Sequence, residues 1–169
     1  MDIRKLGPQD AETYFNIRLE ALFNNPEAFG SSYEEEKKQS ADKYKERFQD
    51  TASYTFGAFG DSKLVGVITL MTETRMKLRH RTTIFAMYVT PEMRGKGVAK
   101  SLMNEAINKA MTLEGIEQIY LTVVSSNVAA KKLYTSLGFE VYGTEKRALK
   151  IDQTYLDEDL MVLFLNKLK

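Results

Sequence analysis

Apolar residues recur at helical spacing in the second half of the chain. Within residues 97–113 they fall three and four positions apart, at Val98, Leu102, Met103, Ala106, Ile107 and Ala110. Such spacing predicts an amphipathic helix, and Gly115 is expected to end it. A shorter helix is expected over residues 127–137, because Asn127 suits a helix N-terminus and Gly138 stands just past the end.

Segments rich in β-branched and aromatic residues predict the strands. They lie at residues 3–6, 54–58, 64–70, 83–89, 119–123, 139–151 and 159–165. Two further helices are expected, one that stops before Asn24-Asn25-Pro26 and a polar one over residues 40–50. The early strands suit antiparallel pairing, and the late strand–helix–strand order suits a crossover. The pattern therefore predicts a mixed α/β sheet flanked by helices.

Composition narrows the class of protein. The 169 residues suit a single domain over residues 1–169, and the net charge of +1 gives no sign of nucleic-acid binding. The chain has no cysteine, and His80 is its one histidine, so we expect no metal site. No apolar run has the length of a membrane span, and residues 1–6 lack the apolar core of a signal peptide. We therefore expect a cytoplasmic protein that does not bind membranes.

The segment Arg94–Ala99 reads Arg-Gly-Lys-Gly-Val-Ala and directly precedes the long helix. The first backbone N–H groups of a helix lack partners within it, and its dipole is positive there, so such a turn can hold an anion. Gly95 and Gly97 let a ligand approach the backbone closely, while Arg94 and Lys96 add positive charge. The alternative is an ordinary tight turn with two solvated bases.

Two familiar phosphate loops do not fit this segment. A Walker A loop would need glycine and lysine where Lys100 and Ser101 stand. The dinucleotide motif Gly-x-Gly-x-x-Gly would need its third glycine at Lys100, and it belongs on the first strand of its fold. A phosphate site here would belong to another class.

A second pattern covers residues 127–139. Ala130, Leu133 and Leu137 share one face of the expected helix and should lie in the core, and Tyr134 lies beside that face. Taken singly, these residues are explained by a capped helix with a half-buried tyrosine.

Together the two segments resemble the GCN5-related N-acetyltransferase (GNAT) family. The family's loop, Arg/Gln-x-x-Gly-x-Gly/Ala, is matched by Arg94, Gly97 and Ala99. Its pattern Asn-x-x-Ala-x-x-x-Tyr-x-x-x-Gly-Phe is matched by Asn127, Ala130, Tyr134, Gly138 and Phe139. The close match covers residues 83–142. The resemblance implies a mostly antiparallel sheet with a splayed central parallel pair, in one domain.

The resemblance implies acetyl-CoA as the donor. Its pyrophosphate would lie on the loop, and the strand before the loop would bulge and offer free backbone groups to the pantetheine arm. One N–H there would polarise the thioester carbonyl. Tyr134 matches the family's usual acid and would protonate the departing sulfur. The residues implied to bind the donor are Met87, Tyr88, Val89, Arg94, Gly95, Lys96, Gly97, Val98, Ala99, Asn127, Ala130 and Tyr134.

The acceptor implied is a primary amine of a small molecule or peptide, which attacks the acetyl group directly in a ternary complex. Several family members carry a carboxylate on the strand equivalent to residues 83–89, and this chain has none there. Tyr33 and Glu34 are candidates to line the acceptor pocket, and Tyr88 could orient a water. A solvated charge run is the simpler interpretation of residues 34–36, so deprotonation through water is favoured.

Three other features have two interpretations each. The basic segment 75–81 could reach the 3′-phosphate of CoA, or be a solvated hairpin. The acidic residues 157–159 could attract a polycation, or be a polar turn before the last strand, the interpretation favoured. Val162 and Phe164 are expected to be exposed and would permit a homodimer, although a monomer fits equally.

Two classes of function follow. The first is an N-acetyltransferase, which the retained Tyr134 favours. The second is a non-catalytic sensor module that binds acyl-CoA, which the absence of a carboxylate on residues 83–89 favours slightly.

Overall fold

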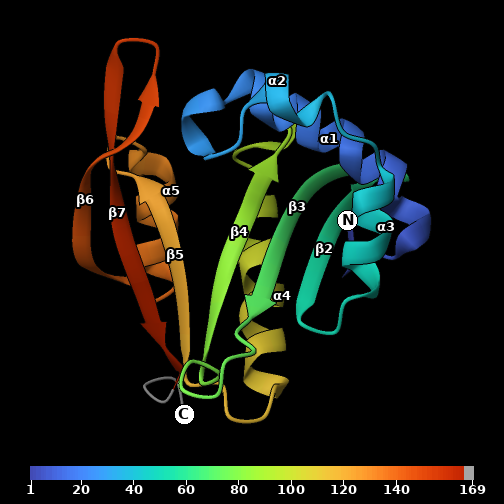
Figure 1. The fold of residues 1–169 in the computed structure, drawn as a ribbon. Coiled ribbons are helices and arrows are strands. Elements are labelled where there is room, and N and C mark those ends of the chain that lie inside the picture. Colours follow the sequence, from blue (N-terminus) through green and yellow to red (C-terminus); the bar gives the residue numbers. More distant parts are fainter. Residues whose placement is uncertain (166–169) are drawn as a thin grey trace.

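The strands form one mixed sheet (Figure 1). The computed structural model describes residues 1–165. Its seven strands run in the spatial order β1-β2-β3-β4-β5-β7-β6. They are β1 Asp2–Lys5, β2 Ser53–Gly60, β3 Lys63–Thr72, β4 Arg81–Val89, β5 Gln118–Val124, β6 Glu140–Ile151 and β7 Thr154–Phe164. Within the described residues β4 and β5 are the one parallel pair, which confirms the predicted mixed, mostly antiparallel sheet.

Helices cover both faces of this sheet (Figure 1). On one face lie α4 (Val98–Thr112) and α5 (Val128–Ser136). The other face and the upper end are covered by α1 (Ala11–Asn24), α2 (Tyr33–Glu36) and α3 (Asp42–Gln49). Short 3-10 turns are η1 (Pro8–Asp10), η2 (Pro26–Ala28) and η3 (Pro91–Met93).

Two apolar clusters hold the helices to the sheet. The first joins α4 to the strands, where Leu102 and Ala106 pack with Ile68 and all three are 0% exposed. The second joins α1 and α3, where Tyr14 packs edge-on against Phe48. Each fully buried large side chain contributes roughly 1.5–3 kcal/mol by leaving water. The helical spacing in residues 97–113 therefore predicted both α4 and its buried face correctly.

The parallel pair separates along its length, as the family resemblance implied (Figure 1). The ladder joins only Arg81–Thr83 to Gln118–Tyr120, and beyond it the two strands diverge. Near the middle of β4 the register with β3 shifts, so that Ala86 and Met87 together stand opposite Ile68. Ala86 has a φ of +52°, a left-handed conformation found at bulges. The strand before the loop is therefore both bulged and splayed.

The last strand corrects two expectations. Residues 157–159 are not a turn but part of β7, which begins at Thr154. Asp159 is 6% exposed because it faces α5, where polar partners meet its carboxylate. Val162 is 4% exposed rather than free, because β7 lies between β5 and β6. Phe164 is partly buried, so these two residues offer no open apolar surface for a dimer.

Helix α5 also differs in detail from expectation. Tyr134 is 8% exposed and packs its ring 6.1 Å from that of Phe139. Ala130, Leu133 and Leu137 lie only partly buried at the edge of the core. The face turned to the core is thus centred on Tyr134, because the tyrosine ring reaches deeper than the small and aliphatic residues beside it.

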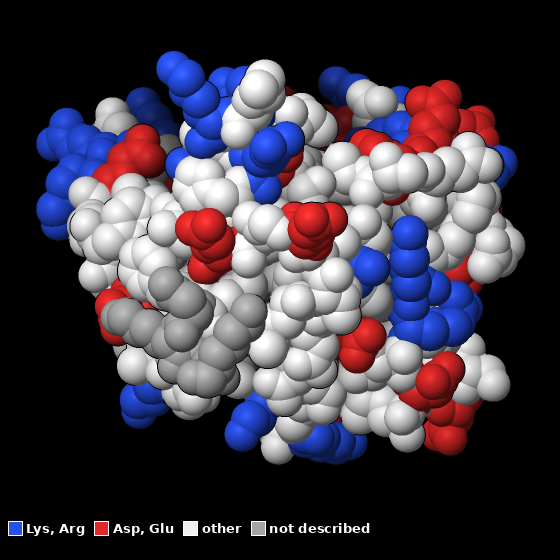
Figure 2. Space-filling model, turned by 90° about the horizontal axis from the view of Figure 1, so that it is seen from below, with Lys and Arg blue, Asp and Glu red and all other residues white. Residues whose placement is uncertain are grey.

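Charged groups of both signs share the face of the molecule shown in Figure 2, where Lys and Arg side chains are interspersed with Asp and Glu.

Within the part of the chain that the structure describes, no helix has the length and apolarity needed to cross a membrane.

Candidate active site

The loop after β4 opens directly into the N-terminus of α4. Gly95 and Gly97 have φ values of +72° and +82°, a backbone region that glycine adopts easily. The first bond within the helix runs from the Ser101 N–H to the Gly97 carbonyl at 3.0 Å, and no side chain caps the helix. The N–H groups of Val98 and Ala99 therefore point out of the helix end, where they can donate to an anion.

Space for such an anion is present beside the two glycines. A Cβ built on Gly95 or Gly97 would meet no atom within 4 Å. The Val98 side chain is buried and Ala99 is half-buried, so these residues offer their backbone and not their side chains. Lys96 is exposed, with its ammonium 3.8 Å from the Met93 sulfur.

Arg94 fastens the loop. Its Nε donates to the Val89 carbonyl at 3.0 Å, and another guanidinium nitrogen donates to Asn25 Oδ1 at 2.7 Å. The guanidinium carbon also lies 5.5 Å from the centre of the Tyr88 ring. Arg94 thereby links the end of β4 to the end of α1. No motif in the sequence pointed to its partner Asn25.

The residues expected to meet the pantetheine arm follow the bulge of β4. Met87 is half-buried, whereas Tyr88 and Val89 are 5% and 7% exposed. Within the described residues, the edge of β4 beyond Thr83 that faces β5 has no strand paired to it. An extended ligand can add its own polar groups there, as a strand would.

Beyond the end of β5, α5 brings in the second motif. Asn127 Oδ1 accepts from the Ala130 N–H at 3.2 Å, so this asparagine caps the helix as its position predicts. Burial raises the pKa of Tyr134 to about 12. Among the described residues its hydroxyl has no hydrogen-bond partner. The Tyr134 phenol therefore stays protonated at neutral pH, with its proton available to a ligand.

A buried carboxylate secures this helix to the sheet, and the sequence reasoning missed it. Asp159 pairs with the Lys131 ammonium and accepts from Ser125 Oγ at 2.7 Å and from Thr144 Oγ1 at 2.9 Å. The hydrogen bond from Lys131, joined by that from Ser125, lowers the pKa of Asp159 to about 2. The junction between β5 and α5, which carries Asn127, is thereby tied to β7.

A second polar group that the sequence reasoning missed surrounds Tyr88. The Tyr88 hydroxyl donates to Glu20 Oε1 at 3.0 Å and accepts from Asn24 Nδ2 at 3.3 Å. Glu20 and Asn24 stand one helical turn apart on α1, and this spacing was the one available signal that they share a face. Burial raises the pKa of Tyr88, and Glu20 adds to the rise.

The residues expected to line the acceptor pocket lie on α2. The Tyr33 ring is 5.5 Å from that of Phe23, which is 70% exposed at the end of α1. Glu34 is exposed and pairs with Lys37 at 2.6 Å. Glu36 is buried, against expectation, because Lys43 neutralises it and Tyr44 donates to it. The structure thus joins Tyr33 to Phe23 but leaves Glu34 in solvent.

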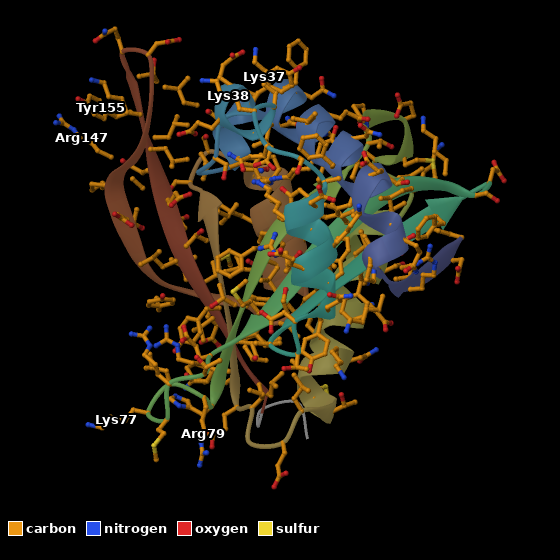
Figure 3. All side chains as sticks on the ribbon, turned by 45° about the vertical axis from the view of Figure 1, so that its right-hand side comes forward. Lys37, Lys38, Lys77, Arg79, Arg147 and Tyr155 are labelled. Carbon is orange, nitrogen blue, oxygen red and sulfur yellow. The ribbon has the colours of Figure 1, made fainter. Side chains whose placement is uncertain are left out.

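The basic segment 75–81 lies far from the loop. It leads into Arg81, the first residue of β4, whereas the loop follows Val89, the last. Nine residues of strand separate the two, a length on the order of 25 Å at about 3.3 Å per residue. Figure 3 shows Lys77 and Arg79 at the opposite end of the molecule from Lys37 and Lys38. This segment is therefore too distant to reach the phosphates of any nucleotide that binds at the loop.

Comparisons with known proteins agree with this geometry. Spermidine N(1)-acetyltransferase of Vibrio cholerae serotype O1 is 30% identical over 157 residues, which are 90% of this chain and 89% of that protein. L-amino acid N-acetyltransferase AaaT of Escherichia coli K12 is 32% identical over 97 residues, or 57% of this chain and 59% of that protein.

Solved structures show the same fold. A putative acetyltransferase from Salmonella typhimurium, solved with its cofactor acetyl-CoA, superposes with a TM-score of 0.85 at 20% identity, over 98% of this chain and 94% of that one. A GNAT acetyltransferase from Streptococcus pneumoniae also has a TM-score of 0.85, at 22% identity, over 96% and 98% of the two chains. Residues 16–139 match the model of the acetyltransferase (GNAT) family. This chain therefore belongs to the acetyltransferase (GNAT) family.

Proposed function

We propose that the protein transfers an acetyl group from acetyl-CoA to a primary amine of a small molecule or peptide, by direct attack in a ternary complex. The observation that carries the proposal is the continuity of the donor site. A bulged strand with a free edge leads, through the loop at residues 90–97, to a helix N-terminus with no side-chain cap. The names of the relatives, which act on spermidine and on amino acids, support an amine acceptor.

The donor site fits a nucleotide with an extended arm. The pyrophosphate would accept from the N–H groups at the start of α4, beside Gly97, where no Cβ occupies the space. The pantetheine amides would pair with the free edge of β4 near Met87. An N–H of the bulge would polarise the thioester carbonyl, an effect worth about 3 kcal/mol in comparable sites.

Tyr134 would act as the acid. When the amine nitrogen bonds to the carbonyl carbon and the carbon–sulfur bond breaks, the thiolate takes the phenolic proton, and the phenolate is reprotonated from the new ammonium group. A thiol has a pKa of about 8.5, well below the value of about 12 for Tyr134. The transfer is uphill, so the phenol assists a leaving group that already departs fairly well.

Thiol release from acetyl-CoA across a panel of amines tests the proposal, with product mass as the second readout. The panel should contain polyamines, amino acids and peptides with free N-termini. We expect release that depends on both the amine and the enzyme. If the protein binds CoA tightly in calorimetry but acetylates no amine, it is the sensor module instead. The absence of a carboxylate on residues 83–89 fits that outcome.

The proposal extends to the setting of the enzyme. We take residues 1–169 as one N-acetyltransferase domain that works in the cytoplasm as a monomer or homodimer. Sedimentation of the full chain with and without CoA would measure the oligomeric state.

A further inference from the structure

The hydroxyl of Tyr88 is held by two groups and still has one position open. A phenol has one proton to donate, and its oxygen can accept hydrogen bonds. The proton points to Glu20 at 3.0 Å, and Asn24 occupies one acceptor position at 3.3 Å. Because the ring is 5% exposed and packed in the α1 cluster, the hydroxyl cannot swing away from these partners. The remaining lone pair can therefore accept from a donor that enters the site.

Tyr88 lies on β4 beside the bulge, where the thioester is proposed to bind. Tyr88 directly follows the bulge formed by Ala86 and Met87. Asn25, next in the chain to Asn24, binds Arg94 at the start of the loop. The following turn η2 contacts β5, so the end of α1 reaches from β4 to β5 where these two strands no longer pair. An amine that approaches a thioester bound at the free edge of β4 from the side of α1 would meet the Tyr88 network.

We propose that Tyr88 accepts a proton from an alkylammonium acceptor and passes its own proton to Glu20. This proposal rests on the acetyltransferase function proposed above. One N–H bond of the ammonium breaks and an O–H bond forms at Tyr88 Oη, while the former Tyr88 proton bonds to Glu20 Oε1. The amine keeps the electron pair and is ready to attack. Glu20 is partly exposed, so its carboxylic acid can return the proton to water. Tyr88 is then a catalytic residue, and Glu20 and Asn24 are positioning residues.

The charges around the phenol suit this role. Glu20 faces it from α1 and Arg94 from the loop, and these are the charged groups that act on it among the described residues. Burial and Glu20 raise the pKa of Tyr88 more than Arg94 lowers it. The phenol therefore holds its proton at neutral pH, and a relay needs that proton to pass on. The network also supplies a carboxylate, that of Glu20 on α1, in place of the one that β4 lacks.

The test is the dependence of kcat/KM on pH for Glu20→Gln and Tyr88→Phe, with the best alkylamine of the panel. Near pH 7 we expect each variant to lose about 10²- to 10⁴-fold, the range of general base catalysis. The loss should shrink to about tenfold or less near pH 10, because roughly 30% of an amine of pKa about 10.4 is already neutral there. Glu12→Gln, an exposed carboxylate on the same helix, should behave as the wild type throughout.

Two further readouts separate a relay from a structural role. The affinity for CoA and the melting temperature should stay near wild type in Tyr88→Phe, which removes only the hydroxyl. The double variant should lose little more than the worse single variant, because the two groups act as a unit. If Glu20→Gln does not fold, the pH profile of Tyr88→Phe alone decides.

A loss of equal size at every pH, or no loss in either variant, would overturn the relay while leaving the acetyltransferase function intact. A wild-type protein that acetylates no amine would overturn both.

Discussion

Replacing Asp159 by asparagine removes the charge that ties α5 to β7. The side chain is 8% exposed and is surrounded by Lys131, Ser125 and Thr144, so the solvent screens these contacts little. Its pKa of about 2 lies well below the ordinary value of 3.8. At about 1.4 kcal/mol per unit, this difference corresponds to about 2.5 kcal/mol of stability. We expect Asp159→Asn to lose about that much, a large share of the roughly 5–15 kcal/mol typical of a domain.

The direction of the pKa shift determines how the stability loss of Asp159→Asn depends on pH. Because folding lowers the pKa of Asp159, its contribution is complete above the unfolded value near 4 and disappears as the pH falls towards about 2. The difference in unfolding free energy between wild type and variant should be constant from about pH 8 to pH 5, and should shrink below about pH 4. Urea unfolding followed by circular dichroism at each pH measures it.

Asp157→Asn is the matched control on the same strand. Its carboxylate pairs with Lys146 but is 32% exposed, so the loss should be much smaller. Equal losses for Asp157→Asn and Asp159→Asn would refute the argument that burial gives the Asp159 network its strength. A difference that persists undiminished at low pH would refute the argument from charge.

Three further changes test the donor site. Gly97→Val should weaken acetyl-CoA binding about tenfold or more in calorimetry, because a β-branched residue is strained at a φ of +82°; unchanged affinity would remove the loop from the site. Lys96→Ala should change that affinity less than about threefold, since the exposed ammonium adds only screened charge. Tyr134→Phe should lower kcat about 10- to 100-fold with the melting temperature preserved, and unchanged turnover would exclude the phenol as acid.

Sequence reasoning succeeded where the signal is local. The helical repeat in residues 97–113 and the glycines before it lie within one continuous segment, and α4 and its N-terminus follow from them. It failed for Asp159, because three consecutive acids resemble a turn until Lys131 and Ser125 are placed beside them by the fold. A buried charge is identified by its partners, and those partners are distant in the chain.

The same contrast divides the two halves of the site. The donor half consists largely of backbone: N–H groups of α4, the free edge of β4, and glycines that permit both. Backbone groups are alike in every residue, so a short motif suffices to encode them. The proposed acceptor half consists of side chains from separate elements, such as Tyr88 and Glu20, which are 68 residues apart and hydrogen-bonded to each other. If the proposed relay is right, such contacts can change without altering the motif, and the choice of amine and the route of its proton depend on α1.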